Sequence, residues 1–380
     1  MNMSLHGLAA RGLAIRLFIY ASLIVCLSGC ATTHDLTANQ QVLFGPSLAS
    51  SALVNGSTQW SMRVQGRVFE PGEGSAGRQA LIDALAPTLG ANRSDPLYRA
   101  RAGYFVSDSV RNARVSIALG DRVAPLEPTD ASGCFAADIP VGSDEVAHLA
   151  RDGLIAFESL PTPGQASRFH GTALLVPPEG VTVVTDMDDT LKETNIRDRA
   201  EAKANTFVRP FRAVAGMSAL YRAWQQASSA PVHFHVVSAG PWQFHEPLRR
   251  FTEEAGFPPF TWDMRCIDIT NPAVLVEETV KPDPQRVEDF KVAAIRALLV
   301  RLPLRHVVLV GDSGERDPEA YAAIVKEFGA RVDAVYIRNV SCEGQDAKRY
   351  ADLFGPSNAL HKLQVFENPE QLPQRLNGVR

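Results

Sequence analysis

The sequence predicts an α/β protein in which an all-β, sandwich-like domain precedes a parallel sheet with helices on both faces. Before residue 178, short apolar runs alternate with polar residues and are separated by turn residues, as in β-sandwiches. After it, apolar runs are continuous and alternate with helical patterns, as in buried parallel strands. The 380 residues, 45% hydrophobic and 21% charged, suit several globular domains and exclude a disordered or fibrous chain.

The β-like part of the chain shows alternation at 59–64 and again at 115–119, which indicates half-buried strands. A single helix is expected at 78–89. No catalytic constellation occurs in this part of the sequence, which favours a scaffold or docking role. A Pro-Pro-Glu-Gly run at 177–180 marks its boundary with the later part of the chain.

The later part of the chain carries the pattern of a parallel sheet. Apolar runs predict strands at 181–185, 232–237, 307–310 and 332–337, and amphipathic runs predict helices at 213–227, 285–302 and 318–328. In such sheets, ligands bind at the carboxyl ends of the strands. The residues that come directly after each predicted strand are therefore the candidates for chemistry.

The N-terminal residues predict export and membrane anchoring. Arg11 and Arg16 precede an apolar run at 17–27 that is too short to span a bilayer, which is typical of a secretory signal peptide. The run ends Leu-Ser-Gly-Cys and resembles a bacterial lipobox, so we expect acyl chains on Cys30 that anchor the protein in the cell envelope. Ala31, and not Asp, follows the cysteine, so in a Gram-negative cell the usual sorting rule implies the outer membrane, with the protein facing the periplasm. The expected domains are a signal peptide at 1–29, a lipidated tether at 30–56, the β-domain at 57–177 and the catalytic domain at 178–380.

The net charge bears on binding partners, and the cysteines bear on a zinc site or a disulfide. The net charge of −4 comes without a basic tail, so nucleic acid is not an expected partner, and protein partners stay unknown. Cys134, Cys266 and Cys342 are widely spaced and form no CxxC pair that would indicate a zinc site. One disulfide fits an exported protein, but the spacing does not choose its two cysteines.

Acidic residues follow the first and third predicted strands. Asp186 and Asp188 come directly after 181–185, and alternate residues of an extended chain point the same way. Two close carboxylates repel each other unless a cation lies between them, and oxygen ligands favour Mg²⁺. Asp312 follows 307–310 and is a further candidate ligand. Asp317, before Pro318, is a candidate ligand or a helix N-cap.

The remaining candidates would bind a phosphoryl group. Ser238 and Ala239 follow the strand at 232–237, where a hydroxyl and backbone N–H groups can hold phosphoryl oxygens. Lys291 lies in the helix before the third of these strands and would neutralise negative charge in the crevice. Lys281, in a Pro-rich stretch, is the competing lysine.

These residues, in this order, resemble the four motifs of the haloacid dehalogenase superfamily of phosphotransferases, whose catalytic domain is Rossmann-like. The resemblance implies that Asp186 is the nucleophile that forms an aspartyl-phosphate. It implies that Asp188 is the general acid for the leaving group and then the base for water. Ser238 and Lys291 would bind the phosphoryl group. The implied Mg²⁺ ligands are Asp186, Asp312 and the backbone carbonyl of Asp188, and Asp317 stays a further candidate ligand.

Longer segments are similar to the catalytic domain of the actin-patch phosphatidate phosphatase family, a lipin-like branch. They are DMDDTLKET at 186–194, FHVVSAGPW at 234–242 and LVGDSGERDPEAY at 309–321. The similarity spans roughly 180–340, and the preceding β-domain fits the family's bacterial members. Gly240 departs from the pattern, since a second serine is expected there. The family implies Mg²⁺-dependent removal of phosphate from phosphatidate, a membrane lipid.

The spacing of the motifs leaves no room for a large folded cap between Thr190, Ser238 and Lys291, so we expect an open site that suits a membrane lipid. Basic residues follow the first motif and would face an anionic membrane or, since acids are interspersed, form a solvated helix face. They are Arg197, Arg199, Lys203, Arg209 and Arg212.

The function expected from the sequence is hydrolysis of phosphatidate to diacylglycerol and phosphate by a Mg²⁺-dependent, membrane-anchored enzyme. Two alternatives stay open. One is a phosphatase for another phosphomonoester, and the other is a catalytically silent lipid-binding or scaffold module of the envelope. The presence of both Asp186 and Asp188 favours chemistry over binding alone.

Overall fold

The computed structural model describes residues 32–54, 57–71, 76–267, 278, 282–355 and 360–376. By its contacts the chain divides into Met1–Thr32 and Thr33–Arg380, and the helices and strands of the described residues all belong to the second unit. The expected signal peptide, Cys30 and Lys281 lie outside the described residues. Within those residues, none of the helices is both long enough and apolar enough to cross a bilayer.

A six-stranded parallel sheet forms the later part of the chain, in the order β14-β13-β12-β15-β16-β17. The expectation of an α/β protein with a parallel sheet is confirmed. Its strands are β12 (Gly180–Thr185), β13 (Val232–Pro241), β14 (Phe260–Arg265), β15 (Arg305–Asp312), β16 (Val332–Arg338) and β17 (Leu363–Phe366). The sequence patterns missed the edge strands β14 and β17, because short strands at an edge carry weak apolar runs.

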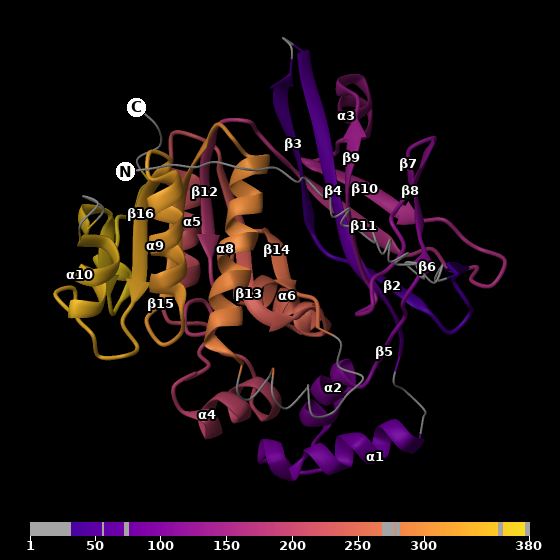
Figure 1. Ribbon diagram of the computed structural model, residues 1–380, viewed down its shortest axis with the longest axis horizontal. Coiled ribbons are helices and arrows are strands. Elements are labelled where there is room, and N and C mark those ends of the chain that lie inside the picture. Colours follow the sequence, from indigo (N-terminus) through magenta and orange to yellow (C-terminus); the bar gives the residue numbers. More distant parts are fainter. Residues whose placement is uncertain are drawn as a thin grey trace, which may run out of the picture. The chain divides into compact units, whose positions relative to one another are not determined.

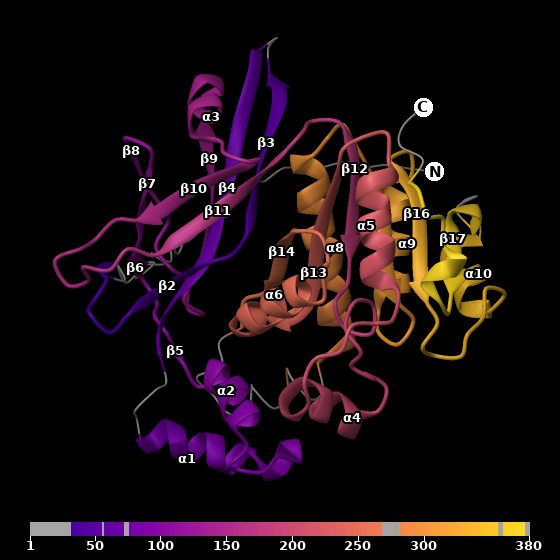
Figure 2. The same ribbon diagram turned by 180° about the vertical axis from the view of Figure 1, so that it is seen from behind.

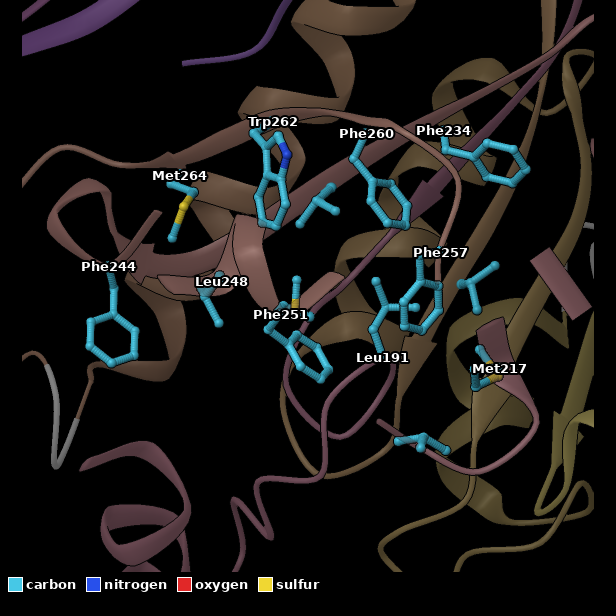
Figure 3. Packing of buried hydrophobic residues seen from close by; sticks show 14 of the residues in the cluster. Leu191, Met217, Phe234, Phe244, Leu248, Phe251, Phe257, Phe260, Trp262 and Met264 are labelled. Atoms are coloured by element: carbon cyan, nitrogen blue, oxygen red, sulfur yellow. The ribbon is translucent and has the colours of Figure 1, made fainter. Parts of the chain in front are cut away.

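Helices cover both faces of this sheet (Figures 1 and 2). The helices and helical turns of this part of the chain are α4 (Arg199–Lys203), the π-helical turn η2 (Ala204–Val208), α5 (Met217–Ala227), η3 (Trp242–Phe244), α6 (His245–Glu254), α8 (Pro284–Arg301), α9 (Asp317–Phe328), α10 (Lys348–Phe354), η5 (Leu360–Lys362) and η6 (Pro369–Gln371), and α4 lies beyond the end of the sheet. In β12, Val183 belongs to the core under α5 and α6, shown in Figure 3, and Val184 to the core under α8 and α9. The alternation of side chains along one strand thus builds two cores.

The earlier part of the chain forms a nine-stranded sheet centred on the long strand β4. Its strands are β2 (Gln41–Phe44), β3 (Ser47–Val54), β4 (Ser57–Glu70), β5 (Asp108–Ser109), β7 (Ser116–Leu119), β8 (Arg122–Pro125), β9 (Cys134–Val141), β10 (Leu154–Ser159) and β11 (His170–Val176). Beside it lie the pair β1 (His34–Asp35) and β6 (Ala113–Arg114) and the helix α3 (Ser143–Leu149). Hydrogen bonds link the nine strands into one sheet, so a division into two facing sheets stays a prediction.

The tether expected at 30–56 is wrong for the described residues from His34 onward. Strand β3 pairs antiparallel with β4 and parallel with β11, and Leu48 and Ala49 are buried. The Ser/Ala-rich sequence of β3 resembles a polar linker, but its small side chains fit a closely packed strand. Leu48 and Val176 belong to the same core as the helices α8 and α9, so the two sheets share packed residues.

The single helix expected at 78–89 is also corrected. The structure has α1 (Ala76–Leu85), the turn η1 (Pro87–Leu89) and α2 (Pro96–Phe105). Asp95 caps α2 by accepting hydrogen bonds from the N–H groups of Leu97 and Tyr98, and Pro96 occupies the first turn. Buried residues of α1 and α2 belong to the core of the parallel sheet, so this excursion packs on the catalytic part.

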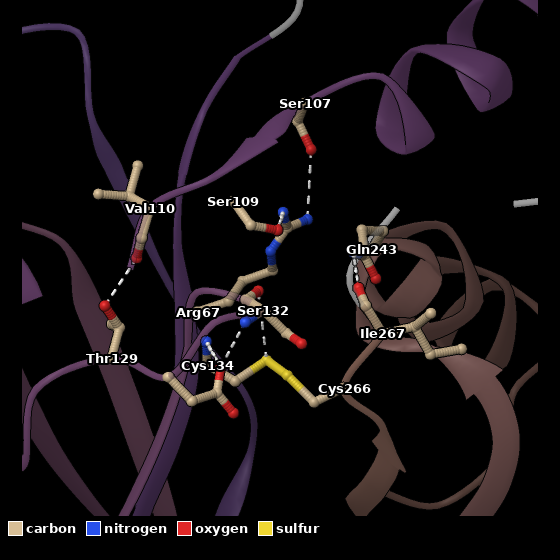
Figure 4. Close-up of a disulfide and its surroundings, with 11 residues drawn as sticks. Arg67, Ser107, Ser109, Val110, Thr129, Ser132, Cys134, Gln243, Cys266 and Ile267 are labelled. Carbon is tan, nitrogen blue, oxygen red and sulfur yellow. Dashed lines mark hydrogen bonds between the residues drawn. A yellow bond between two sulfur atoms is a disulfide. The ribbon is translucent and has the colours of Figure 1, made fainter. Parts of the chain in front are cut away.

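A disulfide joins the two parts of the chain. Cys134 at the start of β9 is bonded to Cys266, which follows β14, with the two Cα atoms 6.4 Å apart (Figure 4). Cys342 is free and exposed. The structure therefore identifies Cys134 and Cys266 as the disulfide pair, which the sequence left open.

Candidate active site

Three neighbouring strands bring the predicted residues to one edge of the parallel sheet. Strand β12 lies between β13 and β15, and Asp186 directly follows β12. Ser238 lies near the end of β13, and Asp312 is the last residue of β15. Because the strands are parallel, their carboxyl ends meet, as the strand-end rule requires.

Lys291 is the buried cation of the site. Its Nζ lies 2.9 Å from Asp186 Oδ1 and 2.6 Å from Asp317 Oδ1, with Glu315 Oε2 at 3.2 Å. The lysine is 1% exposed, so burial alone would lower its pKa, but these carboxylates outweigh burial and raise its pKa. Lys291 therefore stays charged where phosphoryl oxygens would bind.

Carboxylate oxygens of Asp186, Asp312 and Glu315 lie within 4.8 Å of one another. The Oδ2 atoms of Asp186 and Asp312 are buried and have no hydrogen-bond partner among the described residues. Burial, with mutual repulsion, raises the pKa of all three groups. An all-oxygen, anionic cluster with two unpartnered buried oxygens fits a Mg²⁺ ion.

Glu315 was not among the candidates from the sequence. Its signal was available, because it is an acid in the same loop as Asp312 and Asp317 at the end of β15. It was not predicted because only acidic residues at the positions of the superfamily motifs were taken as candidate ligands.

Asp317 is fully engaged within the protein. Its Oδ1 accepts from Lys291 Nζ, and its Oδ2 accepts from the backbone N–H of Asp312 at 3.1 Å. A side chain at Gly311 would place Cβ 2.4 Å from Asp317 Oδ2, which explains the glycine. Asp317 thus orients Lys291 and Asp312, and its carboxylate is outside the group formed by Asp186, Asp312 and Glu315.

The Asp188 carboxylate is not part of that group and is paired with a lysine. Its Oδ1 accepts from Lys192 Nζ at 2.7 Å and from Thr194 Oγ1 at 2.5 Å, and its side chain is 27% exposed. Burial alone would raise the pKa of Asp188, but the Lys192 ammonium and the two hydrogen bonds hold it below its ordinary value. Lys192 is a second residue that the sequence interpretation missed, although it stands four positions after Asp188.

Asp189 stabilises the loop that runs from residue 189 to residue 196. Its carboxylate accepts from the backbone N–H groups of Thr194, Asn195 and Ile196 at 2.7–2.8 Å. Its own backbone has a φ of 53°, which few side chains tolerate. This turn fixes where Asp188 points.

Ser238 and Ala239 complete the edge. Ser238 is buried, and its Oγ accepts from the N–H of Gly240 at 3.2 Å. A Cβ at position 240 would lie 3.3 Å from that Oγ, so the serine expected there would crowd Ser238 in this loop conformation. Ala239 lines a cavity of about 720 Å³ together with Asp188 and Lys192.

Residues 181–339 match a protein family described as the catalytic domain of phosphatidate phosphatase APP1. The resemblance inferred from the sequence is thereby confirmed. The match contains every candidate residue except Cys30, and it ends before the last strand of the sheet. Phosphatidate phosphatases are phosphoric monoester hydrolases, which is the enzyme class expected from the sequence.

Two curated proteins are similar to part of this chain. Phosphatidate phosphatase APP1 of Saccharomyces cerevisiae is 27% identical over 220 residues, which are 57% of this chain and 34% of that protein. An uncharacterized protein of Schizosaccharomyces pombe, C29B5.04c, is 29% identical over 164 residues, 42% of this chain and 25% of that one. The chain thus spans a quarter to a third of the length of these relatives.

Solved structures resemble this chain only weakly. A β-glucuronidase of Parabacteroides merdae covers 78% of this chain and 40% of its own, with 10% identity and a TM-score of 0.24. A similarity of that size does not establish a shared fold. The similarity to the APP1 catalytic domain is a match over residues 181–339, the segment that contains the strand-end residues.

Proposed function

We propose that this protein is a Mg²⁺-dependent phosphatase that hydrolyses phosphatidate to diacylglycerol and phosphate through an aspartyl-phosphate on Asp186. One observation carries the proposal. Buried Asp186, Lys291 and Asp312 form a cluster with half-buried Glu315 at the strand ends, inside the segment that matches the APP1 catalytic domain. Four carboxylates, counting Asp317, face one ammonium group, and this excess of negative charge favours a bound divalent cation.

The fold supports the same chemistry. The parallel sheet has its first strand, β12, in the interior, and chemistry-bearing residues follow β12, β13 and β15. We interpret this arrangement as a Rossmann-like sheet of the haloacid dehalogenase type. In such sheets the site lies at the strand ends, where Asp186 is found.

The first half-reaction forms the intermediate. A carboxylate oxygen of Asp186 bonds to phosphorus, and the ester bond from phosphorus to the diacylglycerol oxygen breaks. In the free protein Lys192 favours the charged form of Asp188, so Asp188 takes up a proton from solvent when the anionic substrate binds beside it. The leaving oxygen takes the electron pair and receives this proton from Asp188. Lys291, held by Asp317, stabilises the charge on the phosphoryl oxygens, and Ser238 and Ala239 contribute hydrogen bonds.

The second half-reaction regenerates the enzyme. Asp188 accepts a proton from water, whose oxygen bonds to phosphorus while the bond to Asp186 breaks. Phosphate leaves, and Asp186 is again a carboxylate. When bound by Asp186, Asp312, Glu315 and the Asp188 backbone carbonyl, Mg²⁺ supplies positive charge against the phosphoryl oxygens.

The proposed setting is a membrane surface. We propose that lipidated Cys30 anchors the protein in a bacterial envelope membrane, facing the periplasm, where the substrate is a membrane lipid. More than one acyl chain gives stable anchoring. Metabolic labelling with a fatty acid tests this point, and loss of the label in Cys30→Ser is the expected result.

The test is phosphate release by the purified full chain from phosphatidate in detergent micelles, with Mg²⁺ or with EDTA. We expect release only with Mg²⁺, and loss of release in Asp186→Asn. Release from a small phosphomonoester but not from phosphatidate would keep the phosphatase and replace its substrate. Lipid binding without any release, in a folded protein, would support the silent module instead.

A further inference from the structure

Arg101 is a buried arginine of α2, in the part of the chain that precedes the catalytic segment. It is 5% exposed, and among the described residues no carboxylate forms an ion pair with it. Its Nη1 donates instead to the backbone oxygens of Thr206 at 2.9 Å and Arg209 at 2.7 Å. Its guanidinium lies over the ring of Phe211, 3.7 Å from the ring centroid. Because a buried charge that loses its partners is costly, these contacts fix Arg101 and its three partners relative to one another.

The three partners lie in one short segment, which consists of η2 and the residues up to position 211. This segment pairs with the loop that holds the general acid. The N–H of Glu193 donates to the backbone oxygen of Arg212 at 2.9 Å, and the N–H of Val214 donates to that of Leu191, also at 2.9 Å. Figures 1 and 2 both show α2 and α4 at the end of the parallel sheet where the site lies. A displacement of the segment would therefore displace the loop.

A first chain of hydrogen bonds runs from Arg101 through η2 to Asp188. Arg209, whose backbone oxygen accepts from Arg101, donates from its Nη1 to Asn205 Oδ1 at 3.1 Å. Asn205 is buried, and its Nδ2 donates to the backbone oxygen of Thr194 at 3.1 Å. Thr194 Oγ1 in turn donates to Asp188 Oδ1 at 2.5 Å. Each step of this chain is a direct contact between neighbouring side chains or backbone groups.

A second connection runs through the ring of Phe211. Lys192 is 1% exposed, and its Nζ lies 5.2 Å from the centroid of the ring that also contacts Arg101. The same Nζ lies 2.7 Å from Asp188 Oδ1. Both side chains that hold the Asp188 carboxylate, Thr194 and Lys192, are therefore linked to Arg101.

We propose that Arg101 is a positioning residue for the general acid, and that it holds η2 and Phe211 where Thr194 and Lys192 direct the Asp188 carboxylate at the leaving oxygen. The inference rests on the proposed function and deepens it, because it adds a residue outside the matched segment 181–339 to the reaction. Arg101 is not among the residues that line the cavity beside the site, so it acts through Asp188. A misplacement of about 1 Å in a catalytic group can lower a rate about a hundredfold.

The test measures kcat and KM of the purified full chain on dioctanoyl phosphatidate with Mg²⁺, at one detergent concentration. In Arg101→Met the side chain still packs on Phe211 but cannot donate to the two backbone oxygens. Asn205→Ser is the second variant, since it removes the hydrogen bond to Thr194 and leaves Arg101 in place. If Arg101→Met does not fold, Asn205→Ser decides alone.

Arg99→Met is the matched control. Arg99 lies on the same helix, and its side chain donates to Asp83 and Gln79, both in α1, and to the backbone oxygen of Arg93. None of these contacts leads to η2. Thermal melting of all three variants checks their folding.

We expect Arg101→Met and Asn205→Ser to lower kcat about tenfold or more and to keep KM within about twofold, because Asp188 acts in the transition state and does not hold the bound substrate. The loss should be smaller with p-nitrophenyl phosphate, whose leaving group departs without a proton. Arg99→Met should match the unmodified protein. An unchanged kcat, a loss confined to KM, or an equal loss with both substrates would overturn the inference and leave the phosphatase in place.

The same variants separate this inference from the proposed substrate. If phosphatidate is not hydrolysed, glycerol 3-phosphate takes its place, because its leaving group is also an alcohol. The expected losses there would uphold Arg101 and replace the substrate. No phosphate release from any of these substrates by the folded, unmodified protein would overturn both the proposed function and the inference.

Discussion

Lys291 Nζ lies 2.9 Å from Asp186 Oδ1, and both side chains are at most 2% exposed. The proposed nucleophile and the proposed phosphate-binding cation therefore form a buried ion pair before any substrate binds. The phosphoryl group must enter between charges that are already in position, which is the arrangement that electrostatic catalysis of phosphoryl transfer needs. The same pair makes the protein's stability depend on Lys291.

Loss of Lys291 should destabilise the fold. In Lys291→Met the carboxylates of Asp186 and Asp317 lose their buried partner, and such a change costs about 3–5 kcal/mol in free energy of unfolding. Urea unfolding measures this cost, with Lys326→Met, an exposed lysine of α9, as control. Equal stability of the two variants would show that Lys291 does not compensate the buried carboxylates.

Mg²⁺ should stabilise the protein through Asp312. A ligand that binds only the folded state adds about 2.7 kcal/mol at a hundredfold excess over its Kd, so Mg²⁺ should raise the Tm of the unmodified protein. Asp312 Oδ1 accepts from the N–H of Gly314, but its buried Oδ2 has no partner among the described residues. Asp312→Asn removes this buried carboxylate, so we expect its Tm in EDTA to be higher than that of the unmodified protein, with little further gain from Mg²⁺. If Mg²⁺ raises the Tm of Asp312→Asn as much as it raises the Tm of the unmodified protein, Asp312 is not a ligand of the metal.

The metal-free protein should lose stability as pH rises. The pKa values of Asp186 and Asp312 are raised above the ordinary 3.8, so the folded state binds more protons than the unfolded state above that pH. Their contribution is complete below about pH 3.8 and is lost as pH rises through the folded pKa values, by at most about 1.4 kcal/mol per pH unit for each group. Urea unfolding in EDTA at a series of pH values should therefore give a shallower fall for Asp312→Asn. If the free energy of unfolding falls with pH equally steeply in Asp312→Asn and in the unmodified protein, the raised pKa of Asp312 is contradicted.

Reduction of the disulfide should weaken the fold without touching the active-site cluster. Cys134 and Cys266 are 132 residues apart, and a cross-link that closes so long a loop adds about 2–5 kcal/mol. The double variant Cys134→Ala, Cys266→Ala should lose that free energy of unfolding, whereas Cys342→Ser, at an exposed free cysteine, should lose none. No difference between them would mean that the cross-link adds no stability.

Ligands of parallel sheets bind at the carboxyl ends of the strands, so the site could be predicted where clear apolar runs mark those strands. Apolar runs placed β12, β13 and β15, and because parallel strands share an edge, Asp186, Ser238 and Asp312 could be expected together. Lys192 and Glu315 were equally local signals, at short spacing from Asp188 and Asp312, and a search beyond the known motif would have found them.

The parts that the sequence did not predict depend on distant contacts. Arg101 of α2 donates to the backbone oxygen of Thr206, 105 positions away, so no window of sequence shows that α2 packs against η2. The small residues of β3 give no apolar run, yet pairing with β4 and β11 makes them part of the sheet. In both cases tertiary packing overrides the local pattern.

The central claim is that Asp186 attacks phosphorus. Its most direct test is acid quenching of the full chain during turnover of phosphatidate with Mg²⁺, followed by mass spectrometry of the peptides. The account predicts a phosphorylated peptide with the modification on Asp186, absent in Asp186→Asn. Phosphate release with no such peptide, or with the phosphoryl group on another residue, would contradict it.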